Sequence, residues 1–430
     1  MVGVLYFECL TIIVLMSLLF YISKKSIVFL WFCTIYLVVF PLSGLYLYYT
    51  GDYSPVGQPY WENENAYLYS SVLSLSSIVL VFVSYYISLC FFKIKFDSVD
   101  LLYKKSNNLF YIIMASFSLL TLFLLFQKYG GFFNFIQNIN SYRSGGGVGA
   151  GFLQYPATML LPTILFFHMA TNPNAKNFGK FYILFFALSL IPLIILGFRG
   201  PVVIITLQFS FFYHHFISKI GFKKIAVYSL LLFLILLTWG YLREARDSTS
   251  FSFIVLFELA ISVVIFRTRG IEVLSAIVSR PEKIDYNYFL ANLVESFTSF
   301  IPRAIYAAKD ISTTEKITTI YFSNDLFSIG IIKEIYGGVS STFLGHAYWS
   351  AGALGVIIVS IVTGVIIGVV QNLYSYSRGN TIVIFFVGMF FSYIHFYIES
   401  FQLAINAFIM NILMFSVFFF ILPKRVKNDF

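Results

Sequence analysis

Residues 343–370 read FLGHAYWSAGALGVIIVSIVTGVIIGVV, a stretch without a single Asp, Glu, Lys or Arg. An α-helix rises about 1.5 Å per residue, so about twenty apolar residues cross the roughly 30 Å hydrocarbon core of a bilayer. An uncharged run of this length is typical of a membrane span. We therefore interpret 343–370 as a transmembrane helix.

The rest of the chain repeats this pattern. Hydrophobic residues make up 59% of its 430 residues and charged residues 11%, and the mean hydropathy is +0.85. A soluble domain of this length could not hide so much apolar surface from water. The other predicted spans are 3–22, 27–49, 66–92, 108–126, 152–171, 181–197, 202–218, 224–241, 381–397 and 401–422.

These runs predict an all-α polytopic membrane protein with about eleven transmembrane helices (about 10–12). We expect one transmembrane domain, 1–430, into which a long outer loop, 242–342, carrying short helices is inserted. Within that loop 251–266 is apolar but short and contains Glu258. It is either a twelfth span or a re-entrant or interfacial helix.

Lysine clusters give the orientation. They fall in every second loop, where the positive-inside rule places the cytoplasm. The N-terminus is then predicted on the periplasmic side and the C-terminus in the cytoplasm, as for a multi-pass protein of the bacterial inner membrane. The clusters contain Lys24, Lys25, Lys93, Lys95, Lys104, Lys105, Lys176, Lys180, Lys219, Lys223, Lys224, Lys424, Arg425 and Lys427, and Arg378 lies on the same side.

The arginines show the opposite bias, because eight of the ten fall on the predicted outer side. The guanidinium group is a planar, always charged fork that fits a phosphate group with two hydrogen bonds. The bias therefore indicates an outward-facing site for a polyanion. The alternative is that these arginines pair with lipid headgroups or with acids of the same loop. The predicted diphosphate-binding residues are Arg199, Arg243, Arg246, Arg267, Arg269 and Arg303.

Arg199 is the arginine with the most specific setting. It lies in GFRGP, 197–201, between two apolar runs that are joined by almost no loop. A guanidinium group at that depth is unfavourable unless it faces a polar cavity or an anion. The alternative is an interfacial arginine whose side chain reaches the headgroups.

His346 is the predicted catalytic base, because an imidazole group near neutral pKa can accept a proton from a hydroxyl group. The neighbouring Tyr348 and Trp349 are candidates for stacking on a sugar ring. Acidic alternatives for the base are Glu272 and Glu399, followed by Glu258 and Glu295. His346 is otherwise interpreted as a headgroup contact at the membrane interface.

No metal or cofactor site is expected. Glu62 and Glu64 form a carboxylate pair in an outer loop, but two glutamates at this spacing are common by chance. The glycine-rich segment 144–151, SGGGVGAG, lacks the Lys-Ser/Thr of a phosphate-binding loop. The sequence shows no signature of nucleotide hydrolysis.

Several features together resemble one family, the O-antigen or oligosaccharide repeat-unit polymerases of the Wzy type, and more distantly the O-antigen ligases. These features are the number of spans, the turn GFRG at 197–200, the long arginine-bearing outer loop and the motif GHAYWSAGALG at 345–355. The resemblance covers most of the chain as architecture. Many relatives have an acidic residue where His346 stands, whereas ligases have a histidine near the equivalent junction.

The resemblance implies an inverting glycosyltransferase that polymerises undecaprenyl-diphosphate-linked oligosaccharide repeat units on the periplasmic face. The outer arginines would take the place of a metal ion, and no cofactor is implied. The implied partners are the lipid-linked oligosaccharides, membrane lipid and, as a further candidate, a chain-length regulator, with no nucleic acid. The alternatives are a flippase or transporter of lipid-linked oligosaccharides and an O-antigen ligase. The long segment 242–342 and the lack of repeated halves argue against a transporter.

Overall fold

The computed structural model describes ten segments of the chain. They are 2–22, 26–45, 64–93, 108–137, 151–172, 175–196, 199–218, 270–279, 342–376 and 380–399.

Within these segments the chain is helical and contains no strand. This confirms the all-α class for the described residues. The elements are α1 (Val2–Ile22), α2 (Ile27–Leu37), the π-helical turn η1 (Val38–Leu42), α4 (Glu64–Phe91), α5 (Asn108–Lys128), α6 (Phe132–Gln137), α8 (Gly151–Thr171), the short turn η4 (Ala175–Phe178), α9 (Gly179–Ile195), α10 (Arg199–Phe216), α13 (Gly270–Val278), α17 (Phe343–Tyr376) and α18 (Thr381–Glu399).

Nine of the eleven predicted spans coincide with helices among the described residues. Five helices are long and apolar enough to cross a membrane, namely Ile27–Leu45, Asn65–Phe91, Tyr111–Lys128, Ala175–Ile195 and Phe343–Tyr376, and three shorter helices are also apolar. The predicted spans 224–241 and 401–422 and the apolar stretch 251–266 lie outside the described residues. The chain is thus a multi-pass membrane protein, and the number of spans remains a prediction.

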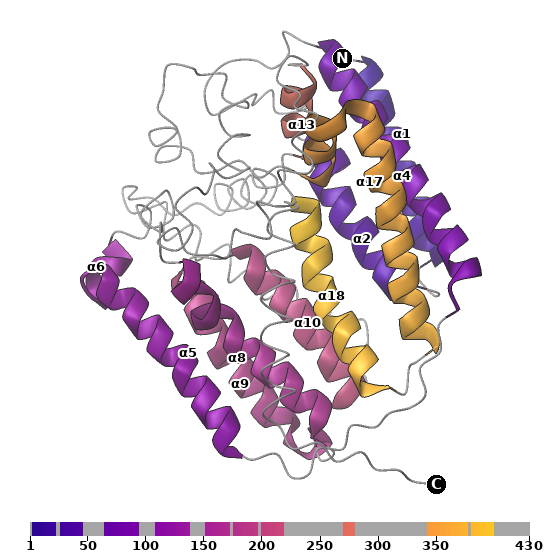
Figure 1. Cartoon of the computed structure of the whole chain (residues 1–430). Helices are drawn as coiled ribbons and strands as arrows, with labels where there is room; N and C mark the ends of the chain where they lie inside the picture. Colours follow the sequence, from indigo (N-terminus) through magenta and orange to yellow (C-terminus); the bar gives the residue numbers. More distant parts are fainter. Residues whose placement is uncertain are drawn as a thin grey trace, which may run out of the picture. The chain divides into compact units, whose positions relative to one another are not determined.

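The described helices belong to two compact units, which we describe separately (Figure 1). Unit 1 contains α1, α2, η1, α4, α13, α17 and α18, and unit 2 contains α5, α6, α8, η4, α9 and α10. Within unit 1, α4 and α17 run side by side and form its most extensive helix pair (Figure 1).

Small residues allow α4 and α17 to approach closely. A methyl group placed on Gly364 would clash with Ser84 and with the carbonyl group of Val81. At the end of the same interface, Asn372 Nδ2 donates to the Phe92 carbonyl oxygen at 2.7 Å and so caps α4. Without a hydrophobic driving force between helices in lipid, such close packing and polar contacts hold them together.

The π-helical turn η1 contains Pro41, which has no backbone N–H and therefore breaks the regular bonding of α2. Ser43 follows the turn, and its hydroxyl group lies 2.7 Å from the Val39 carbonyl oxygen and 2.9 Å from that of Phe40. Phe40 also packs edge-on against Phe343 of α17, with ring centroids 6.0 Å apart. The turn therefore positions the end of α2 against the start of α17.

Unit 2 is held together by aromatic pairs. The rings of Phe186 and Phe209 stack with centroids 4.0 Å apart and join α9 to α10. Phe166 of α8 stacks on Phe212 of α10 at 4.8 Å. His168 Nδ1 lies 2.8 Å from the Tyr182 hydroxyl group and joins α8 to α9.

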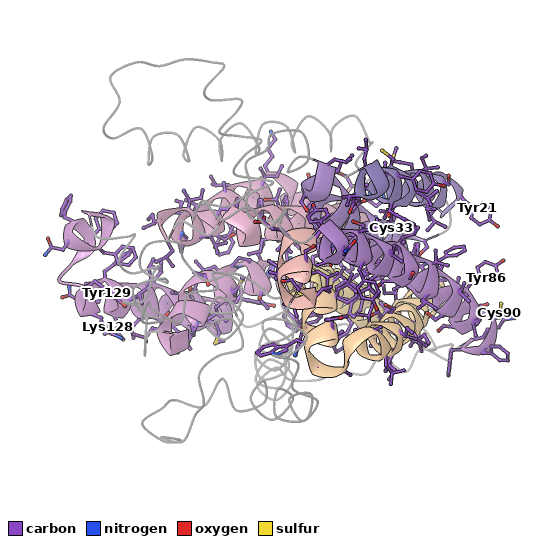
Figure 2. All side chains as sticks on the ribbon, turned by 90° about the horizontal axis from the view of Figure 1, so that it is seen from above. Tyr21, Cys33, Tyr86, Cys90, Lys128 and Tyr129 are labelled. Atoms are coloured by element: carbon purple, nitrogen blue, oxygen red, sulfur yellow. The ribbon has the colours of Figure 1, made fainter. Side chains whose placement is uncertain are left out.

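The outward faces of both units are apolar. Tyr86 and Cys90 of α4 are exposed and point away from unit 1, whereas Cys33 of α2 is buried between helices (Figure 2). In unit 2, Ile112 of α5 is 61% exposed. In a membrane protein these faces meet lipid, which is why they need no covering.

Candidate functional site

Helix α17 is broken near its start. Ala351 has φ −155° and ψ 25°, and Gly352 has φ 58° and ψ −149°, so neither residue has helical backbone angles. All eight residues before the break, 343–350, are buried. Irregular backbone at membrane depth occurs where protein covers it or where it lines a cavity, often beside a binding site. We therefore place the candidate site at this end of α17.

His346 lies on the short helical segment that precedes the break and is 5% exposed. Its backbone N–H donates to the Thr342 carbonyl oxygen at 2.9 Å, and the Thr342 hydroxyl group accepts from the Gly345 N–H at 3.1 Å. At the other end, the Ser350 hydroxyl group donates to the His346 carbonyl oxygen at 2.9 Å. These bonds fix the backbone of His346 in a capped two-turn helix.

Glu272 lies in the first turn of α13 and is 2% exposed. Helix α13 packs against the segment that carries His346 (Figure 1). A methyl group placed on Gly345 would lie 3.0 Å from Ile277 Cδ1 and 3.9 Å from Val273 Cγ1. Two of the three predicted catalytic residues therefore lie on helices that touch each other within unit 1.

Tyr348 and Trp349, the predicted sugar-binding residues, are on the same short segment and are 9% and 5% exposed. The Tyr348 ring packs edge-on against Tyr69 of α4, with centroids 6.3 Å apart. Little of either ring is accessible in this structure. Contact with a sugar would require neighbouring side chains to move, so their role stays a prediction.

The remaining predicted site residues are placed only in part. Arg199 is the first residue of α10 and Glu399 the last of α18, but their side chains lie outside what the structure describes. The other five predicted diphosphate-binding arginines also fall outside the described residues; they are Arg243, Arg246, Arg267, Arg269 and Arg303. The anion site therefore remains a prediction from the sequence.

One acidic residue beside this site was missed by the sequence interpretation. Glu8 of α1 is 1% exposed, and its Oε1 accepts a hydrogen bond of 2.7 Å from the Ser71 hydroxyl group of α4. The signal was present, because Glu8 is the only charged residue in the apolar run 2–22. An ionisable residue inside a membrane span is a functional candidate by default.

The described part of unit 1 thus holds two buried carboxyl groups and a buried imidazole group, from Glu8, Glu272 and His346. Across the described residues, no cluster of three or more His, Cys, Asp or Glu could hold a metal ion. The groups that this end of unit 1 offers are suited to accepting protons and hydrogen bonds from hydroxyl groups.

Comparison with known proteins identifies the family. No curated protein and no solved structure matches the chain. A family model described as O-antigen polysaccharide polymerase Wzy matches residues 1–428, almost the whole chain. The chain therefore belongs to the O-antigen polysaccharide polymerase Wzy family.

Proposed function

We propose that the chain is an inverting glycosyltransferase that polymerises undecaprenyl-diphosphate-linked oligosaccharide repeat units on the periplasmic face of the bacterial inner membrane. Membership of the Wzy family makes it a membrane protein of O-antigen polymerisation that acts on lipid-linked repeat units. The structural observation that supports the proposal is the broken start of α17. The short segment before the break carries His346 and packs against α13, the helix that contains Glu272.

In the proposed reaction a hydroxyl oxygen of the terminal sugar on one repeat unit attacks the anomeric carbon of the growing glycan. The bond between that carbon and the lipid diphosphate breaks, and the bonding electrons leave with the diphosphate. Attack from the opposite side inverts the anomeric configuration. The proton of the attacking hydroxyl group passes to a base of the protein. The protein has therefore to stabilise negative charge on one substrate and remove a proton from the other.

The arginines are proposed for the first task. Arg199 lies where two helices meet, and the outer-loop arginines would add further guanidinium groups around the diphosphate. A guanidinium group offers two parallel hydrogen bonds to a phosphate group and stays charged. We therefore propose that charge stabilisation comes from arginine and needs no metal ion.

His346 is proposed for the second task. It lies in the first turn of α17 beside the helix break, where burial by protein excludes water. A neutral imidazole group can accept the acceptor proton as the new glycosidic bond forms. Glu272 and Glu399 remain alternatives for the base. Tyr348 and Trp349 would supply apolar ring surface to the acceptor sugar once it enters.

The proposal includes an orientation and a partner. The lysine pattern supports a periplasmic N-terminus, a cytoplasmic C-terminus and a periplasmic segment 242–342. A chain-length regulator in the same membrane is proposed as a protein partner, since the polymerisation reaction itself does not determine how many repeat units the product contains.

The deciding experiment uses a strain that lacks the gene for this chain. A polymerase predicts lipopolysaccharide that carries a single repeat unit, restored to long chains when the gene is returned. Loss of all repeat units would instead indicate a flippase or a ligase. As a direct test, the purified protein in liposomes should elongate undecaprenyl-diphosphate-linked repeat units, and a metal chelator should not stop it.

A further inference from the structure

Glu8 is buried in an environment that disfavours a carboxyl group. It is the only charged residue of α1 and is 1% exposed. Burying such a group costs free energy unless its oxygens have partners, and the cost is greatest in a membrane. An ionisable residue inside a span is a functional candidate, which makes its contacts informative.

The Glu8 carboxyl group is only partly satisfied by hydrogen bonds. Its Oε1 accepts a bond of 2.7 Å from Ser71, whose hydroxyl group also lies 3.1 Å from the Tyr67 carbonyl oxygen. Since a hydroxyl group has one proton, Ser71 serves one of these acceptors at a time. Glu8 Oε2 is fully buried and has no hydrogen-bond partner within the described part of the chain.

The same carboxyl group packs at Gly44, a position that the start of α13 also approaches. A methyl group placed on Gly44 would lie 3.1 Å from Glu8 Cδ and 3.2 Å from Ile271 Cγ2. Glu8 and Ile271 therefore converge on Gly44, two residues after the end of η1, and Ile271 directly precedes Glu272. Gly270, the residue before Ile271, has no room for a side chain, because the Val39 carbonyl oxygen of η1 lies against it.

Helix α4, which carries Ser71 and Tyr67, packs against α13. The same helix also packs against α1, which carries Glu8. Helix α13 thus packs against α4 and η1, and both of these elements also pack against α1. A change in the Glu8 side chain has a physical route to Glu272, through Gly44 and Ile271 and through helix α4.

We propose that Glu8 is a positioning residue for glycosyl transfer, whose carboxyl group, held by Ser71 and packed at Gly44, sets the place of the first turn of α13 and so of Glu272. This inference rests on the proposed function, in which Glu272 takes part in the site. It assigns no contact between Glu8 and substrate.

The test measures kcat and KM for elongation of lipid-linked repeat units by the purified protein in liposomes. Glu8→Ala should lower kcat by about tenfold or more, because a lost buried hydrogen bond and a cavity displace α13. KM should change little. Glu8→Gln keeps the volume and the acceptor for Ser71, so it should retain more turnover than Glu8→Ala.

A double-mutant cycle distinguishes positioning from an independent effect. If Glu8 acts through Glu272, the Glu8→Ala/Glu272→Ala double variant should have the kcat of Glu272→Ala alone. The proposal would be overturned if the loss of kcat in the double variant equals the product of the two single losses. Wild-type turnover of either single variant would also overturn it. Failure of the wild-type protein to elongate any repeat unit would instead overturn the proposed function.

Matched controls separate these effects from damage to folding. Ser71→Ala removes the bond to Glu8 and should lower kcat, whereas Ser70→Ala should not. Ser70 is also fully buried on α4, and its hydroxyl group donates to the Ala66 carbonyl oxygen of its own helix, at 2.8 Å. Thr11→Val is the control within α1, since the Thr11 hydroxyl group bonds to the Phe7 carbonyl oxygen of the same helix. Equal losses from Ser70→Ala and Ser71→Ala would contradict the specific role of Glu8.

Discussion

The carbonyl group of Ala347 lies against the Cα of Gly355, so closely that a side chain at position 355 would clash with it. In a regular helix these residues would be more than two turns apart. The contact exists because the chain turns back at Ala351 and Gly352 before the long part of α17 begins. The segment that carries His346 is therefore a separate short helix, packed beside the start of the span.

The first prediction concerns this turn. Gly352 has a φ of 58° with a ψ of −149°, a combination that is open almost only to glycine. Gly352→Ala should cost about 1–3 kcal/mol of strain or shift the His346 segment. We expect a lower melting temperature, reduced polymerisation, or both. Gly3→Ala is the control, because its nearest neighbour is the end of the flexible Leu68 side chain. Wild-type activity and melting of Gly352→Ala would show that the turn is not required.

The second prediction concerns Arg199. Arg199→Ala should abolish polymerisation while the amount of protein in the membrane is unchanged, because the developing charge on the diphosphate loses its partner. Arg199→Lys should rescue poorly, since an ammonium group lacks the two-pronged hydrogen bonding of guanidinium. Chain-length profiles of complemented strains, with the protein quantified by immunoblot, provide the measurement. Full activity of Arg199→Ala would remove this residue from the proposed anion site.

The third prediction concerns the side of the membrane on which 242–342 lies. Cysteines introduced at Ser248 and Thr313 should react with a membrane-impermeant thiol reagent in intact spheroplasts. The background should lack the native Cys9, Cys33 and Cys90, of which Cys9 and Cys90 are exposed. Labelling of either site only after permeabilisation would place the segment in the cytoplasm and exclude the proposed location of the reaction.

The sequence predicted the helices well, because the length and charge of an apolar run are direct consequences of the bilayer. The ends were less predictable. Helix α17 continues to Tyr376, beyond the expected end at residue 370, because its polar residues find partners inside unit 1. Gln371 Oε1 lies 3.0 Å from the Ser26 hydroxyl group, and Asn372 caps α4. Such pairings join residues far apart in sequence and leave no local pattern.

The site was predicted only in part for a related reason. The motif around His346 and the acid Glu272 were both identified from sequence, but the packing of α13 against the His346 segment joins residues far apart in the chain and leaves no local pattern. The break at Ala351 and Gly352 falls within a run that reads as one uninterrupted span. Glu8 could have been found from its charge alone, whereas its partner Ser71 is one of many serines in α4 and became apparent only from the packing.

The central claim is that the start of α17 supplies the group that activates the acceptor hydroxyl. Its most direct test is the turnover of His346→Gln, with His346→Ala beside it, in liposomes loaded with lipid-linked repeat units. If His346 is the base, both variants should lose on the order of a hundredfold or more in kcat while still binding the donor lipid. Gln can donate and accept hydrogen bonds but cannot take the proton. Wild-type turnover and chain length in His346→Gln would contradict the claim and move the search for the base to Glu272 or Glu399.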